Sequence, residues 1–207
     1  MAYPPKHHQE DDYQNIIRLM ETCPLATLIS ADEQEVLVTH LPLMFHPNEK
    51  WGTLVGHIDK FNPQLKHFSA EKEITILFNG PETYISPSVY ATTQLPTWNY
   101  IKAHLKGKIQ LEKKPSKLKE MLIDMTEKLE GKSPNYILEK ENPRMQKALD
   151  YIVGFTIEII TWEGKYKLSQ DKRKDDQEHA KEKLIMENVN MKTTIENLYK
   201  GHRTKTS

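Results

Sequence analysis

Residues 74–88 read ITILFNGPETYISPS and join an apolar run to a dense set of polar and aromatic side chains. The run Ile74–Phe78 is rich in β-branched and aromatic residues, which fit a pleated surface and predict a β-strand. Gly80 and Pro81 form a turn signal, and the polar residues after them lie at the junction of strand and loop. Binding sites are usually built at such junctions. The stretch therefore predicts a β-rich fold with a candidate site at the end of a strand.

The sequence on both sides of this stretch is also typical of β-structure. Five further runs are apolar or alternating and are bounded by polar or glycine-containing breaks, which predicts strands. They are Leu25–Ile29, Val36–Phe45, Thr53–Ile58, Trp98–Leu111 and Phe155–Trp162. The fourth of these is long and contains Gly107, where we expect a β-bulge.

Helical signals flank the strands. The first predicted helix is capped by Asp11 or Asp12 and ends at Pro24, and a short helical turn is predicted at Asn62–Phe68. A longer amphipathic helix is predicted from Pro115 to Gly131, and its apolar face consists of Leu118, Met121, Leu122, Met125 and Leu129. A further helix is predicted around Arg144–Tyr151. Beyond Lys172 the chain is densely charged and has a weak apolar stripe. We expect a solvated C-terminal helix that lies on its own barrel or on a partner subunit, rather than a DNA-reading helix, because acidic residues are interspersed with the lysines.

Composition limits the class of protein. The 207 residues are 37% hydrophobic and 28% charged, which suits one ordinary domain with its own core. Lys+Arg and Asp+Glu both number 29, so no basic excess indicates a nucleic-acid footprint. Cys23 is the single cysteine, residues 1–9 lack an apolar signal segment, and no window reaches the roughly 20 apolar residues of a membrane span. We therefore expect a cytoplasmic protein without a membrane segment.

Several common sites of chemistry are missing from the sequence. It contains no G-x-G-x-x-G, no G-x-x-x-x-G-K-[ST], no G-x-S-x-G and no paired cysteines at zinc spacing, which excludes the usual dinucleotide, nucleoside triphosphate, hydrolase and zinc motifs. The nine histidines are scattered and form no helical metal-binding pair. No metal ligand and no catalytic acid or base is assigned, and His57 is expected to be a hydrogen-bonding histidine at a strand end.

Four segments combine polar and aromatic residues at predicted strand ends. They are Thr39–Pro42, Gly56–Ile58 followed by Asn62–Gln64, Phe78–Ser88, and Pro96–Tyr100. Each segment alone has a structural explanation, because Asn-Pro and Gly-Pro form turns, Ser86 can cap a helix, and Trp98 can fill an interface. In this order, however, the segments match a family.

With these segments the sequence resembles the PaiB-type FMN-binding transcriptional regulators, relatives of the flavin reductase and pyridoxamine phosphate oxidase split barrels. The resemblance covers roughly residues 3–172. The matching boxes are Tyr3, Pro5 and His7; Gly56, His57, Asn62, Pro63 and Gln64; Phe78 to Tyr90; Pro96 to Tyr100; and Lys167 to Asp171. Three positions depart from the family pattern, since His8 replaces an aromatic residue, Val89 replaces Trp and Asp171 replaces Asn.

The resemblance implies an α+β, mainly β fold: a split β-barrel of the FMN-binding type with flanking helices and a C-terminal helix. Residues 1–172 would form the barrel domain, and residues 173–207 a charged helical extension. In split barrels of this kind the flavin lies between two subunits, so a homodimer is implied. DNA stays open as a further partner.

The resemblance also implies a set of FMN-binding residues, which can supply what the cofactor needs. They are Thr39, His40, His57, Asn62, Gln64, Ser86, Trp98, Asn99, Lys167, Ser169 and Gln170. Lysines, including Lys172, and hydroxyls suit the phosphate, amides suit the ring edge, and Trp98 offers an aromatic surface.

Three functions follow from the resemblance and its relatives. The first is a negative transcriptional regulator that binds FMN as a homodimer. The second is a flavin-dependent oxidoreductase, in which the cofactor carries the chemistry. The third is a haem-binding split barrel, which would need a ligand such as His179 or His7.

Overall fold

The computed structural model describes residues 5–69 and 72–203, with side chains as far as Tyr199. Tyr3 of the first family box lies outside these residues. The chain divides by its internal contacts into two compact units: unit 1 contains Met1–Cys23, Leu77–His104 and Trp162–Ser207, and unit 2 contains Pro24–Ile76 and Leu105–Thr161. The expected boundary at Lys172 stays a prediction.

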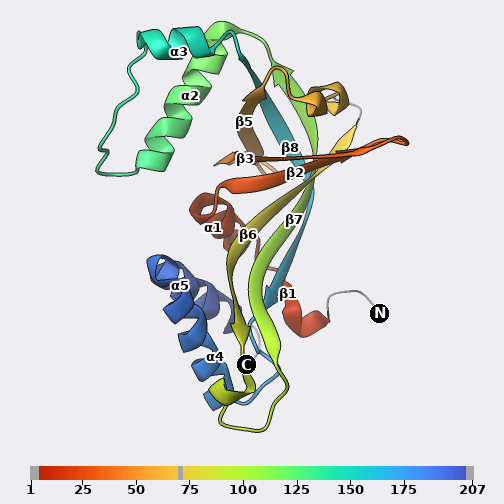
Figure 1. The fold of residues 1–207 in the computed structure, drawn as a ribbon, viewed down its shortest axis with the longest axis vertical. Coiled ribbons are helices and arrows are strands. Elements are labelled where there is room, and N and C mark those ends of the chain that lie inside the picture. The colour runs from red at the N-terminus through yellow and green to blue at the C-terminus, as the bar shows by residue number, and fades with distance from the viewer. Residues whose placement is uncertain (1–4, 70–71, 204–207) are drawn as a thin grey trace. The chain divides into compact units, whose positions relative to one another are not determined.

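Eight strands and nine helical segments are described, and Figure 1 shows how the chain runs through them. The strands are β1 Gln9–Glu10, β2 Leu25–Ala31, β3 Val36–Pro42, β4 Met44–His46, β5 Thr53–Asp59, β6 Glu73–Ile85, β7 Thr97–Glu112 and β8 Ile152–Lys167. The α-helices are α1 Tyr13–Thr22, α2 Pro115–Glu130, α3 Pro143–Ala148, α4 Lys174–Glu187 and α5 Lys192–Arg203, and the 3-10 helices are η1 Lys6–His8, η2 Pro63–His67, η3 Pro87–Val89 and η4 Val189–Met191. None of these helices is both long and apolar enough to cross a bilayer.

The strands form one sheet in the order β3-β2-β6-β7-β8-β5-β4, with β1 paired to β8. The long strands β6, β7 and β8 contribute residues to both units. In unit 2, β2 and β3 form an antiparallel pair from Leu25↔Pro42 to Ala31↔Val36. Strand β3 also contacts β5, from the opposite end of the strand order. The sheet therefore curls on itself in unit 2, which is the arrangement of a barrel.

The core of unit 2 comes from the inward residues of these strands and from α2. Leu28, Leu54 and Phe155 are fully buried. Helix α2 begins at Pro115 and ends at Glu130, and the next residue, Gly131, has a φ of 73° that favours glycine. Its residues Leu118 and Met121 pack over Gly154, where an added Cβ would lie 2.8 Å from Leu118 Cδ1. The apolar face is shorter than predicted, since Leu129 is 53% exposed.

Unit 1 is built around α1 and the two C-terminal helices. Asp12 caps α1 by accepting a hydrogen bond from Gln14 N, as predicted, and Ile16, Leu19 and Met20 are buried. Helix α5 contacts α1, and α4 contacts η3. The buried apolar residues of these two helices are Ala180, Leu184, Ile195, Leu198 and Tyr199. The segment therefore has the apolar stripe expected from the sequence, but it forms two helices rather than the single one predicted.

Three strand predictions also differ from the structure. The run Val36–Phe45 is two strands, β3 and β4, because the ladder breaks at Leu43. Strand β6 continues past Phe78 to Ile85. No bulge occurs at Gly107, where β7 continues with unbroken in–out alternation. Glycine is needed there because a Cβ would lie 2.4 Å from Ile157 Cγ2 on the neighbouring strand β8.

Candidate functional site

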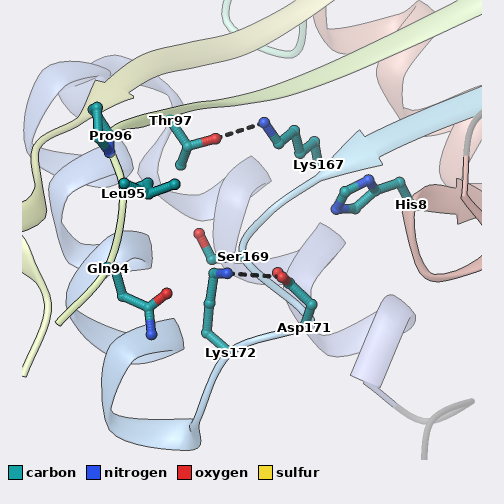
Figure 2. Close-up of a pocket in the computed structure, with 9 residues that line it drawn as sticks. All are labelled: His8, Gln94, Leu95, Pro96, Thr97, Lys167, Ser169, Asp171 and Lys172. Atoms are coloured by element: carbon teal, nitrogen blue, oxygen red, sulfur yellow. Dashed lines mark hydrogen bonds and ion pairs between the residues drawn. The ribbon is translucent and has the colours of Figure 1, made fainter. Parts of the chain in front are cut away.

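A cavity of about 290 Å³ lies in unit 1, where the start of β7 meets the end of β8 (Figure 2). Its walls come from η1, from the loop before β7, and from the turn after β8. The lining residues are His8, Gln94, Leu95, Pro96, Thr97, Lys167, Ser169, Asp171 and Lys172. Ligand pockets usually measure roughly 300–1,000 Å³, so this cavity suits part of a cofactor, such as a phosphate group with its neighbouring hydroxyls.

Lys167 places a cation on the wall of this cavity. It is the last residue of β8, and its ammonium donates a hydrogen bond to Thr97 Oγ1 at 2.5 Å. Thr97 is the first residue of β7, so the bond joins the ends of two neighbouring strands. The lysine is thereby held in position without a carboxylate partner in this bond, and its charge remains available to an anion.

Asp171 and Lys172 form an ion pair on the same wall, with 2.8 Å between carboxylate and ammonium (Figure 2). Burial raises the pKa of Asp171, but the hydrogen bond and charge of Lys172 outweigh it and hold the pKa below its usual value. The hydrogen bond to Asp171 raises the pKa of Lys172. Both groups are therefore charged at neutral pH, and Asp171 partly neutralises the second cation of the cavity.

Ser169 has an unusual backbone and a buried hydroxyl. Its φ is 63°, a left-handed conformation that costs a non-glycine residue about 1–2 kcal/mol. The Oγ donates to Asn99 Oδ1 at 3.1 Å and lies 2.9 Å from the hydroxyl of Tyr90. Because Ser169 donates to Asn99, Tyr90 donates to Ser169. Strained residues of this kind cluster at binding sites.

Asn99 adds a free donor behind Ser169. Its side chain is fully buried, and its Nδ2 finds no hydrogen-bond partner within the described residues. An unpaired buried donor is costly unless a ligand or water satisfies it. The two ammonium groups and two hydroxyls of the cavity wall fit the phosphate and hydroxyls of a flavin nucleotide, with this amide lying behind Ser169, whereas Asp171 opposes the phosphate.

The predicted residues of unit 1 are only partly brought together. Lys167 and Ser169 line the cavity, and Asn99 bonds to Ser169. The amide of Gln170 instead serves its own turn, because its Oε1 accepts from Leu168 N at 2.6 Å and its Nε2 donates to Tyr166 O. Gln170 stays a prediction as a cofactor ligand.

Two further predicted residues of unit 1 lie outside the cavity wall. Ser86 caps η3, and its Oγ accepts from Ser88 N at 3.3 Å. Trp98 is 48% exposed and pairs with Tyr84, with 6.1 Å between the ring centroids. The pair forms a partly exposed aromatic surface, and the cofactor-binding role of Trp98 stays a prediction.

The other predicted residues belong to unit 2. Asn62 donates to Thr39 Oγ1 at 3.0 Å and caps η2 through Gln64 N. Gln64 is fully buried; its Nε2 bonds to Leu28 O and Leu37 O, while its Oε1 has no partner in the part of the chain that the structure describes. Thr39, Asn62 and Gln64 thus join η2 to β2 and β3.

The two predicted histidines of unit 2 lie on separate strands. His40 is exposed on β3, and its Nδ1 lies 3.0 Å from Thr27 Oγ1 on β2. His57 is half-buried on β5, and burial lowers its pKa. Its ring is therefore neutral at neutral pH, and the hydrogen-bonding role expected from the sequence stays a prediction.

Sequence reasoning missed a cluster of Asp32, Glu35 and His67 in unit 2. His67 Nε2 lies 2.9 Å from Asp32 Oδ2 and 3.8 Å from Glu35 Oε1, and the three ligand atoms lie within 4.8 Å of one another. The carboxylates already have partners, because Lys66 pairs with Glu35, and Asp32 caps Gln34 N and Glu35 N. The cluster therefore fastens the β2–β3 turn to η2.

Comparison with known sequences gives matches over most of this chain. The sequence profile described as "Putative FMN-binding domain" matches residues 2–161. "Protease synthase and sporulation protein PAI 2" of Bacillus subtilis (strain 168) is 32% identical over 197 residues, which are 94% of this chain and 95% of that protein. "Uncharacterized protein AN0679" of Emericella nidulans is 26% identical over 83% of this chain and 85% of its own length. The protein belongs to this FMN-binding family, as its sequence predicts.

Solved structures share the fold. The FAD and heme binding protein of Mycobacterium smegmatis has a TM-score of 0.62 at 15% identity, with 84% of this chain and 80% of that chain covered. The flavocytochrome Anf3 of Azotobacter vinelandii has a TM-score of 0.58 at 13% identity, with 77% and 69% covered. The predicted split barrel with flanking helices is thereby confirmed, and the predicted cofactor, FMN, is the one that defines the family.

Proposed function

We propose that this protein is a homodimeric FMN-binding regulator that represses transcription. The observation that carries the proposal is the near full-length similarity to PAI 2, at 32% identity over 94% of the chain. The name of that relative connects it with protease synthesis and sporulation, and the family profile connects this chain with FMN. A regulator that binds FMN would account for both observations.

The cavity of unit 1 is the proposed place of the FMN phosphate. Lys167 and Lys172 provide charge-assisted donors and Thr97 provides a hydroxyl donor, while Ser169, whose proton goes to Asn99, offers an acceptor at the wall. The Nδ2 of Asn99, buried and without a partner among the described atoms, supplies one more donor beside Ser169. When bound, the flavin supplies a redox-active ring. The residues named here bind and orient its phosphate end.

Exposed apolar side chains near the same elements support the homodimer. Tyr84, Leu95 and Trp98 are 46%, 82% and 48% exposed, and Leu95 itself lines the cavity. Covering such large apolar groups favours association, and aromatic residues are common in the buried centre of subunit interfaces. A second subunit over these side chains would shield the flavin ring from water.

Purification with a visible spectrum and an FMN titration tests the cofactor. A flavin spectrum is expected, while a Soret band would support the haem-binding alternative and overturn this proposal. Rapid NADH or NADPH oxidation by the FMN-loaded protein would support the oxidoreductase instead.

Sedimentation tests the dimer, because a ligand held between subunits stabilises the assembled state by mass action. FMN should shift the protein toward dimer, and dilution should release dimer and flavin together. A monomer that binds FMN tightly would contradict the proposal.

Selection of genomic DNA fragments by the FMN-loaded dimer tests the regulatory role. The proposal of a regulator fails if the dimer retains no fragment over bulk DNA.

A further inference from the structure

Helix α4 holds the loop that forms one wall of the cavity. Asp176 in its first turn is fully buried. Its Oδ1 accepts hydrogen bonds from Ala91 N at 2.6 Å and from Thr92 N at 3.2 Å, and its Oδ2 accepts one from Thr92 Oγ1. These bonds join residues that are 84 and 85 positions apart in the sequence. One carboxylate therefore fixes the start of the loop that leads into β7.

The bonds continue from Asp176 to the cavity itself. Thr92 donates its hydroxyl proton to Asp176, and the same oxygen accepts from Gln94 Nε2 at 2.9 Å. Gln94 lines the cavity, and the chain reaches Thr97, the partner of Lys167, three residues later. The position of this wall thus depends on the Asp176 carboxylate.

The next residue of α4 holds the opposite wall. Gln177 Nε2 donates to Gln170 O at 3.1 Å and to Lys172 O at 2.7 Å. Asp171 and Lys172 of the same turn line the cavity. Two successive side chains of one helix turn therefore hold the two walls, one from the loop before β7 and one from the turn after β8.

Apolar packing keeps the helix itself in place. Ala180, one turn after Asp176, is fully buried against Ile85 and Tyr90, with Val89 packed on the same cluster. Tyr90 in turn bonds to Ser169. The helix is thus anchored to the end of β6 independently of the two polar side chains, which leaves Asp176 and Gln177 to set the positions of the walls.

We propose that Asp176 and Gln177 are positioning residues for the anion-binding cavity, so that the first turn of α4 sets the separation of the walls that grip the FMN phosphate. The inference rests on the proposed function, and it assigns a binding role to a helix beyond residue 161, where the family profile ends. Neither residue needs to touch the ligand.

Asp176→Asn tests the proposal, with Asp175→Asn as a matched control. Both changes remove one negative charge from the same helix turn, but Asp175 pairs with Arg173 at 3.3 Å instead. Asp176→Asn should raise the FMN dissociation constant about tenfold, whereas Asp175→Asn should change it less than about twofold. Thr92→Val, which leaves α4 intact, should weaken binding in the same direction.

Hydrogen exchange of the FMN-free protein gives an independent readout. Asp176→Asn should speed exchange of the Ala91, Thr92 and Gln94 amides but not of amides in α1, because loss of the carboxylate frees that loop alone. Equal exchange in the Asp176 and Asp175 variants would overturn the proposal. Faster exchange with unchanged FMN affinity would overturn it as well, since the contact would then be structural only.

The two proposals can fail separately. If the parent protein bound no FMN, the proposed function would fail, and inorganic phosphate would be the probe of the cavity. Weaker phosphate protection of Lys167 and Lys172 amides in Asp176→Asn than in Asp175→Asn would then still support positioning of an anion site. Equal protection in the two variants, or none in either, would overturn it.

Discussion

The carboxylate of Asp171 lies 2.8 Å from the ammonium of Lys172 on the wall of the cavity. A phosphate that enters the cavity must therefore compete with a carboxylate for one of its two lysines. Loss of that carboxylate frees Lys172, so Asp171→Asn should tighten FMN binding up to about tenfold at low salt. Fluorescence titration with FMN measures this, and Asp175→Asn controls for the change in net charge. Weaker binding by the Asp171 variant would contradict the assignment.

Lys167→Ala should have the opposite effect. A charge-assisted hydrogen bond contributes roughly 1.5–3 kcal/mol, so affinity for FMN should fall by about one to two orders of magnitude. Thr97→Val is the matched variant, because it removes the partner at 2.5 Å but keeps the ammonium, and it should weaken binding less. The effects of Lys167→Ala and of Asp171→Asn on FMN affinity should both shrink at high ionic strength if the site is open to salt. Unchanged affinity in the Lys167 and Asp171 variants together would remove Lys167–Asp171 from the flavin site.

Two tryptophans of unit 1 should separate binding from stability. Trp98 is 48% exposed beside Tyr84, whereas Trp162 packs on Tyr13 with 5.1 Å between ring centroids. Trp98→Ala should weaken FMN binding or dimer assembly more than Trp162→Ala, because an exposed aromatic pair offers its surface to a ligand or subunit. Titration and sedimentation of both variants test this, and equal FMN affinity of parent and Trp98→Ala would count against it.

Local patterns explain what the sequence could predict. Helix α1 was predictable because its cap, Asp12, and its apolar period lie within one short segment. The apolar stripe of the C-terminal segment was also recognised, but its division into two helices was not, because its apolar residues, such as Ile195 and Leu198, are diluted among charges.

The same distinction holds for the site. The Lys167–Asp171 box pointed to Lys167 and Ser169, and both line the cavity. The role of Asp176 was not predictable, since its partners Ala91 and Thr92 are far away in the sequence and no local motif marks the pairing. Gln170 is the converse case: it matches the family box, but its side-chain amide forms hydrogen bonds within its own turn.

The Asp32 carboxylate should make unit 2 sensitive to acid. Hydrogen bonds from Gln34 N and Glu35 N, assisted by His67, lower the pKa of Asp32 to about 2 from 3.8. A lowered folded-state pKa stabilises the protein above the unfolded value, and this stabilisation is lost as the pH falls from about 4 to about 2. Asp32→Ala should therefore lower the free energy of unfolding at pH 7, and the difference from the parent should shrink below pH 4. Urea unfolding across this range tests the prediction, with the exposed neighbour Glu33→Ala as control; a constant difference would contradict it.

Two substitutions of Ser169 should separate the effect of its hydroxyl from the effect of its backbone conformation. Ser169→Ala leaves the Tyr90 hydroxyl and Asn99 Oδ1 without the partner they share, which should cost about 1–3 kcal/mol of unfolding free energy. Ser169→Gly loses the same bonds but relieves the φ of 63°, so it should be about 1 kcal/mol more stable than the alanine variant. Both variants remove the hydroxyl from the cavity wall and should weaken FMN binding equally. Urea unfolding and FMN titration of the pair measure the two effects separately. A glycine variant that is less stable than the alanine variant would contradict the conclusion that the backbone of Ser169 is strained.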